Sequence, residues 1–171
     1  MSAWHLTYYM LIRLSGHVQT SQPFDMQSRC KPTILLVPGA FTTGSCYNSL
    51  VSLLHQKDYK TLVASLPSSN PPDPKTCSAQ QDGEHLVQEY LQPLLDTGND
   101  VLVYAHSYGA TSLGFTGSSL SKRERQACGK HGGVIGLVYM AFAPVPAGES
   151  QLAFVGNQWP PFAKLDKVSC H

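Results

Sequence analysis

Residues 101–109 read VLVYAHSYG, and this stretch says most about the fold. The apolar run Val101–Tyr104 predicts a buried strand that leads directly into Ser107. Ala105 and Gly109, two positions before and after the serine, are small, as a sharp strand-to-helix turn requires where the backbone folds back. Such a nucleophile elbow holds its serine in a strained conformation with the hydroxyl exposed. Because small-x-Ser-x-Gly also occurs in ordinary turns, the surrounding sequence has to distinguish the two.

The composition favours one globular domain that binds small partners. The chain has 171 residues, of which 42% are apolar and 13% charged, and its net charge is +1. These values exclude a disordered tail and a nucleic-acid-binding surface. The densest basic cluster, Lys122, Arg123, Arg125 and Lys130, is interrupted by Glu124. We interpret it as a solvated face and not as a binding patch, so a small-molecule partner is expected.

Five cysteines are scattered without Cys-x-x-Cys or metal-ligand spacing: Cys30, Cys46, Cys77, Cys128 and Cys170. We therefore expect reduced thiols in a cytoplasmic chain, and no metal site. The stretch Leu6–Leu14 is only modestly apolar, and no small-residue cleavage site follows it cleanly. No apolar run is long enough to cross a bilayer, so no membrane association is expected.

Strand-like and helix-like patterns alternate from residue 31 onward, after an irregular N-terminal extension, residues 1–30. Short apolar, β-branched runs predict strands over residues 33–37, 61–66, 101–104 and 134–141. Helical spacing of apolar residues predicts helices over 47–54, 78–95 and 108 to about 120, with Pro93 bending the second. The alternation predicts an α/β fold, with an open parallel sheet of about four strands and helices on both faces.

Gly39 and Ser107 follow two different strands and are expected at one edge of this sheet, where ligands bind beyond the carboxyl ends of the strands. Acyl transfer needs two backbone N–H donors directed at the developing oxyanion. Tyr108, after the serine, would supply one, and Ala40, after the turn at Gly39, the other. Gly39 also lets the backbone approach a substrate closely. Read alone, Pro38–Gly39 is an ordinary turn, but an elbow on the same sheet favours an oxyanion loop.

The segments ILLVPGAF, residues 34–41, and VLVYAHSYG, residues 101–109, resemble the front half of an α/β-hydrolase. The similarity is greatest to the compact esterase and hydroxynitrile-lyase-like branch. Residues 120–125, 132–134 and 137–143 resemble fungal members. The resemblance spans roughly residues 31–165 and implies a partial α/β-hydrolase fold: a core over 31–143 and the start of a cap over 144–171, without the late strands and most of the cap. Pro38 stands where the family usually has histidine, and Ala105 where it usually has glycine.

The resemblance implies a nucleophile at Ser107 that hydrolyses an ester or related acyl bond of a small apolar substrate without a cofactor. It also implies an acid and then a histidine later in the chain, carried on two strand ends. Asp166 and His171 have that order, but they lie five residues apart in an unpatterned tail, and we do not expect them to be the pair.

The other histidines do not supply the base either. His106 lies beside the serine, where the family often carries a histidine without using it as the base. His55 and His85 lie on predicted helices and are interpreted as solvated. The acid and base of the triad are therefore not identified. A catalytically inactive truncated homologue and a non-catalytic small-molecule binder remain alternatives, and the sequence carries no signal for the oligomeric state.

Overall fold

The computed structural model of the protein describes residues 31–71, 73, 76–141, 145, 150, 153 and 156–158. The N-terminal extension 1–30 and all but a few residues of the predicted cap segment 144–171 lie outside this part. Asp166 and His171 lie outside it as well.

A parallel sheet of four strands forms the centre of the described part. Its strands are β1 Thr33–Val37, β2 Thr61–Val63, β3 Asp100–His106 and β4 Gly133–Met140, in the order β2-β1-β3-β4. β1 is apolar after Thr33 and buried throughout, as expected of a strand covered on both faces. The α/β fold with a sheet of four parallel strands is confirmed.

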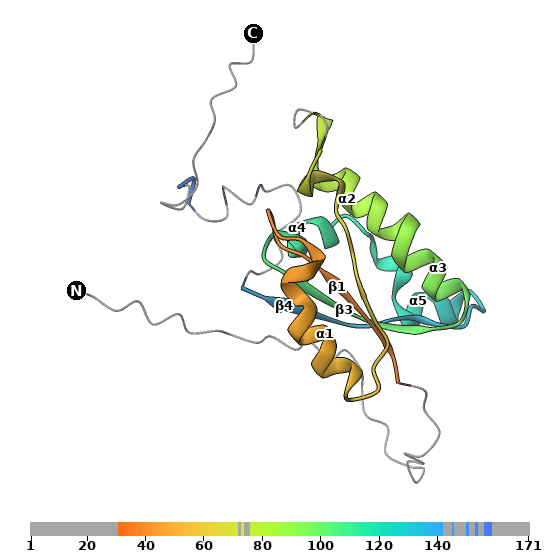
Figure 1. Ribbon diagram of the computed structural model, residues 1–171. Helices are drawn as coiled ribbons and strands as arrows, with labels where there is room; N and C mark the ends of the chain where they lie inside the picture. Colours follow the sequence, from red (N-terminus) through yellow and green to blue (C-terminus); the bar gives the residue numbers. More distant parts are fainter. Residues whose placement is uncertain are drawn as a thin grey trace.

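Helices cover both faces of the sheet (Figure 1). Ile34 and Leu36 of β1 pack towards α1, Asn48–His55, which follows the short helix η1, Gly44–Tyr47. Leu35 and Val37 point to the opposite face, where the helix formed by α2 Ala79–His85, the π-helical segment η4 Leu86–Leu91 and α3 Gln92–Asp96 packs with α4 Tyr108–Leu113. The alternation follows from the two-residue period of a strand. Two apolar layers therefore hold β1 and β3 in place.

The helix predicted over 78–95 is confirmed in extent, but it is not regular. Ser78 begins it, because its side-chain oxygen accepts the N–H of Gln81 at 3.2 Å. Pro93 has no N–H to donate to the carbonyl one turn earlier. The π-helical segment immediately before α3 is the irregularity that accommodates this residue.

Two predicted elements are too long. The strand predicted over 61–66 ends at Val63, because the Ser65 N–H turns away to the hydroxyl of Tyr90 at 2.9 Å. The helix predicted from 108 to about 120 ends at Leu113. The Thr116 hydroxyl donates a hydrogen bond to the Leu113 carbonyl at 2.8 Å. Gly117 has φ 79°, which a helix does not allow. Two short helices follow these shortened elements: η2, Pro67–Ser69, and η5, Ser118–Leu120.

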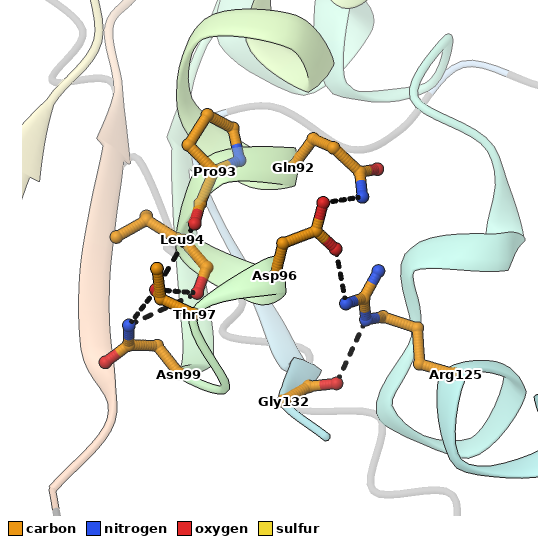
Figure 2. Close-up of polar contacts among 8 residues, drawn as sticks. All are labelled: Gln92, Pro93, Leu94, Asp96, Thr97, Asn99, Arg125 and Gly132. Atoms are coloured by element: carbon orange, nitrogen blue, oxygen red, sulfur yellow. Dashed lines mark hydrogen bonds and ion pairs between the residues drawn. The ribbon is translucent and has the colours of Figure 1, made fainter. Parts of the chain in front are cut away.

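The prediction that the basic cluster forms a solvated face is wrong for two of its residues, Arg125 and Lys122. Arg125, on the unforeseen helix α5, Lys122–Ala127, is only 4% exposed. Its Nε donates to the Gly132 carbonyl at 3.1 Å and its Nη2 to Asp96 at 2.9 Å (Figure 2). Lys122 forms an ion pair of 2.5 Å with Asp100. These contacts connect α5 to α3 and β3, whereas Arg123 and Lys130 are exposed as predicted.

Candidate active site

The bend after β1 and the turn after β3 lie side by side at the carboxyl edge of the sheet. Val37 is in register with Ala105, so both strands end at the same level. A methyl group placed on Gly39 would lie 3.2 Å from the Cβ atom of Ser107 and 3.1 Å from Nδ1 of His106. A side chain on Gly39 would require these neighbours to move by a few tenths of an ångström. The sequence prediction that these two loops share one edge is therefore confirmed.

Ser107 occupies a strained turn between β3 and α4. Its φ is 50° and its ψ is −119°, a conformation that residues with a Cβ atom rarely adopt. The Ser107 N–H donates to the Met140 carbonyl at 2.9 Å, and its own carbonyl accepts the Ala110 N–H at 2.9 Å. The turn is thus held from β4 on one side and from α4 on the other.

The small residues around Ser107 have distinct physical reasons. A methyl group on Gly109 would lie 2.7 Å from the carbonyl oxygens of both Val37 and Pro38. α4 therefore packs directly on the backbone of β1, which only glycine permits. Ala105 is fully buried in the core, where a larger side chain would displace its neighbours.

Two backbone N–H groups beside Ser107 are available for a ligand. Tyr108 is the first residue of α4, and the first N–H groups of a helix have no acceptor within it. The Gly39 N–H is used by the hydroxyl of Tyr47 at 3.2 Å, whereas the N–H of the exposed Ala40 has no acceptor among the described residues. An oxyanion bound between these groups would receive two hydrogen bonds.

Tyr47 has a role that its place in an amphipathic stripe did not suggest. It ends η1, before α1 begins, and its ring is buried. Its hydroxyl accepts the Gly39 N–H and lies 2.8 Å from His106 Nδ1, with the two rings edge to face. The His106 tautomer decides which of the two groups donates in this hydrogen bond. The sequence analysis missed this residue because its partners lie in two other segments.

Asp82 is a second residue that the sequence analysis missed. It is fully buried on α2, and its carboxylate accepts three hydrogen bonds: from Ser68 N–H at 3.0 Å, from Ser68 Oγ at 2.5 Å and from the Tyr108 hydroxyl at 2.7 Å. Burial, followed by the hydrogen bond to Asp82, raises the pKa of Tyr108 above its usual value. Tyr108 therefore remains a phenol that donates to Asp82 at neutral pH. This connects α2 to the residue next to Ser107.

The described residues do not bring a histidine and acid pair to Ser107. His55 is exposed and pairs with the Thr61 hydroxyl at 2.7 Å, and His85 is half-buried against the ring of Tyr90. Within the same part of the chain, no cluster of His, Cys, Asp and Glu has the arrangement of a metal site. No helix described there combines the length and apolar character needed to span a membrane.

A hollow of about 600 Å³ lies away from these loops. Its lining includes Leu91, Val103 and Leu113, together with Ile135, Leu137 and Tyr139 of β4. Neither Ser107 nor Gly39 is among its lining residues. The candidate active site therefore lies at the sheet edge and not in this hollow.

A parallel sheet covered by helices, with a strained serine at its carboxyl edge beside a glycine bend, defines the α/β-hydrolase class of fold. The Alpha/beta hydrolase family matches residues 34–168, and the chain belongs to this family. The expectation of this superfamily from the sequence is thus confirmed.

Two fungal proteins are similar to the chain. The "Alpha/beta hydrolase nvfD" of Aspergillus novofumigatus is 33% identical over 122 residues, which cover 70% of this chain and 46% of that protein. The "Probable hydrolase R7" of a Phoma species is 28% identical over 131 residues, which cover 75% of this chain and 49% of that protein. The chain thus spans about half the length of the curated relatives it matches. No solved structure matches it.

Proposed function

We propose that this α/β-hydrolase cleaves an ester or related acyl bond of a small apolar substrate, with Ser107 as the nucleophile. The observation that carries the proposal is the backbone of Ser107, held at φ 50° at the carboxyl edge of the sheet. Proteins retain such strain where it serves a function, and a nucleophile elbow uses it to expose the serine hydroxyl. The hydrolase names of the two fungal relatives support the same class of reaction.

In the proposed reaction, Ser107 Oγ attacks the carbonyl carbon and transfers its proton to a base. The negative charge that develops on the carbonyl oxygen is stabilised by the N–H groups of Ala40 and Tyr108. Collapse of this intermediate expels the alcohol, which takes up the proton, and leaves an acyl group on Ser107. Water then releases the acid and restores the hydroxyl.

The described residues do not bring a base to Ser107. His106 is the nearest described histidine to this serine in the sequence, but its Nδ1 is bonded to Tyr47. A serine hydroxyl without a paired base is a weak nucleophile, so we expect slow turnover.

The residue after Ala40 supports an apolar substrate. Phe41, the next residue, is 98% exposed and has φ 59°, so that its ring projects from the loop. An exposed aromatic ring beside the proposed oxyanion donor favours an apolar acyl group. No cofactor is part of this proposal.

The test is hydrolysis of p-nitrophenyl acetate and p-nitrophenyl butyrate by the wild-type chain and by the S107A variant, with far-UV circular dichroism to compare their folding. We expect measurable hydrolysis by the wild type and loss of the enzymatic rate in the variant. Equal rates in two folded proteins would overturn the proposal.

The alternatives give different results. Saturable binding of a small ester without turnover would identify a binder. A folded chain that neither binds nor hydrolyses these esters would be an inactive homologue.

A further inference from the structure

Side-chain hydroxyls hold the peptide units on both sides of Gly39: Tyr47 contacts the Pro38–Gly39 peptide, and Thr42 contacts the Gly39–Ala40 peptide. On one side, the Gly39 N–H donates to Tyr47 at 3.2 Å. On the other, the Gly39 carbonyl accepts the Thr42 hydroxyl at 2.7 Å and the Thr42 N–H at 3.4 Å. The buried backbone groups of Gly39 are thus both satisfied.

The Thr42 contacts set the direction of the Ala40 N–H, and Tyr47 fixes the peptide that precedes it. A peptide unit is planar, and in its trans form the carbonyl of one residue and the N–H of the next point in opposite directions. Because Thr42 holds the Gly39 carbonyl on the inner side of the bend, the N–H of Ala40 points to the other side. The exposure of Ala40 agrees with this direction.

Tyr47 also connects this bend to the turn that contains the serine. Its hydroxyl lies 2.8 Å from His106 Nδ1, and Ser107 is the next residue. The ring of Tyr47 is fixed from behind, because it packs in the apolar layer of Ile34 and Leu36 under α1. One rigid side chain therefore spans both loops.

We propose that Tyr47 and Thr42 are positioning residues that orient the Ala40 N–H relative to Ser107. The inference rests on the proposed function, in which Ala40 donates to the oxyanion. Neither side chain takes part in bond making or breaking. Their hydroxyls preorganise the donor, so that no reorientation is needed when charge develops on the substrate.

The test combines the direction of the Ala40 N–H with the reaction rate. Residual dipolar couplings and amide chemical shifts of Gly39 and Ala40 are measured in the ¹⁵N-labelled chain, and ester hydrolysis is measured on the same samples. The variants are Y47F and T42V, which remove a hydroxyl but keep the shape of the side chain. T42S is the rescue variant, because it restores the hydroxyl.

Y90F is the matched control. Tyr90 also accepts one backbone N–H, that of Ser65 at 2.9 Å, but it does so on η4, outside both loops. We expect Y90F and T42S to keep the wild-type couplings at Ala40 and the wild-type rate.

We expect Y47F and T42V to change the Ala40 coupling and to lower kcat by about 10- to 100-fold, with KM within about threefold, because a misaligned donor is lost mainly from the transition state. Unchanged couplings at Ala40 in both variants would overturn the inference. Should Y47F not fold, T42V alone decides, because Thr42 lies outside the core.

The failure of this inference and that of the proposed function are distinguishable. If the Ala40 coupling changes but kcat does not, while S107A abolishes hydrolysis, the positioning role is overturned and the serine mechanism stands. If S107A hydrolyses as fast as the wild type, the proposed function fails. The couplings at Ala40 then still show whether the two hydroxyls orient this peptide.

Discussion

At the turn between β3 and α4, the conformation of Ser107 is maintained against its own preference. A residue with φ 50° and ψ −119° costs about 1–3 kcal/mol relative to a relaxed backbone. The hydrogen bonds to Met140 and from Ala110, together with packing of α4 on β1, hold the residue there. A substitution that relieves the strain should therefore separate stability from activity.

We expect S107G to be more stable than S107A by about 1 kcal/mol, although both lack the hydroxyl. Glycine relieves about 1–3 kcal/mol of strain, partly offset by about 0.5–1 kcal/mol of backbone entropy lost on folding. Urea unfolding measures the difference. Coincident unfolding curves for the two variants would mean that Ser107 is not strained.

At Gly109, the space available for a side chain determines the effect of a substitution on stability. We expect G109A to lower the free energy of unfolding by about 1–3 kcal/mol, because the new methyl group would lie 2.7 Å from two backbone carbonyl oxygens of β1 and Pro38. G44A is the control, since its methyl group would meet Val63 at an ordinary 3.6 Å, and we expect a change within about 0.5 kcal/mol. Urea unfolding again measures both. Equal losses in the two variants would contradict the packing argument.

Between elements, the end of α3 forms a polar connection to α5 on the helix-rich face. Thr97 and Asn99 cap the carbonyl of Leu94 through their side chains, at 2.9 Å and 3.2 Å (Figure 2). The Asp96 carboxylate, in the same turn, accepts hydrogen bonds from the Gln92 side chain at 2.7 Å and from the buried Arg125. A guanidinium that is 4% exposed needs such partners, because an unpaired buried charge is strongly destabilising.

This cluster predicts a pH dependence of stability. The hydrogen bond from Gln92, followed by that from Arg125, holds the pKa of Asp96 below its ordinary value of 3.8. A carboxylate with a lowered pKa stabilises the fold above the unfolded pKa, and this contribution disappears as the pH falls through the folded pKa. We therefore expect the stability difference between the wild type and D96N to be largest near neutral pH and to shrink below about pH 4.

Urea unfolding of the wild type and D96N at several pH values measures this difference. D58N is the control, because Asp58 is exposed and its ion pair with Lys31 is long, at 3.5 Å. A D96N difference that stays constant on acidification would contradict the assigned role of the Asp96 carboxylate.

At the scale of the whole molecule, β4 lies at an edge of the sheet. It pairs with β3 on one side, and its other edge has no partner strand among the described residues. Ile135 is 47% exposed and Leu137 is 39% exposed, beside the hollow on the helix-rich face. Unpaired, apolar strand edges promote association between chains.

We expect this chain to self-associate as its concentration rises, and L137K to weaken that association at least about tenfold, which corresponds to roughly 1.4 kcal/mol. Sedimentation velocity over a concentration series measures the effect. L53K is the control, because Leu53 is 59% exposed on α1, at the opposite face. Equal weakening in both variants would show that association does not involve β4.

Local patterns were sufficient for the order of strands and helices, the turn at Ser107 and the proximity of Gly39. Helix α5 was also within reach of the sequence, because Ser121 and Glu124 form the beginning of a capping box, and the Ser121 oxygen indeed accepts the Glu124 N–H at 3.2 Å. The ends of β2 and α4 were missed, because each depends on a partner in another segment or on a glycine conformation.

The apolar runs and the small residues around Ser107 were sufficient to predict the fold from the sequence alone, because strand burial and a tight turn depend on neighbours in the chain. Tyr47, Asp82 and Arg125 acquired their roles only through folding. Their partners are 59, 26 and 29 residues away, at His106, Tyr108 and Asp96. Hydrogen bonds between segments so far apart leave no periodic pattern, because they depend on how the helices pack on the sheet.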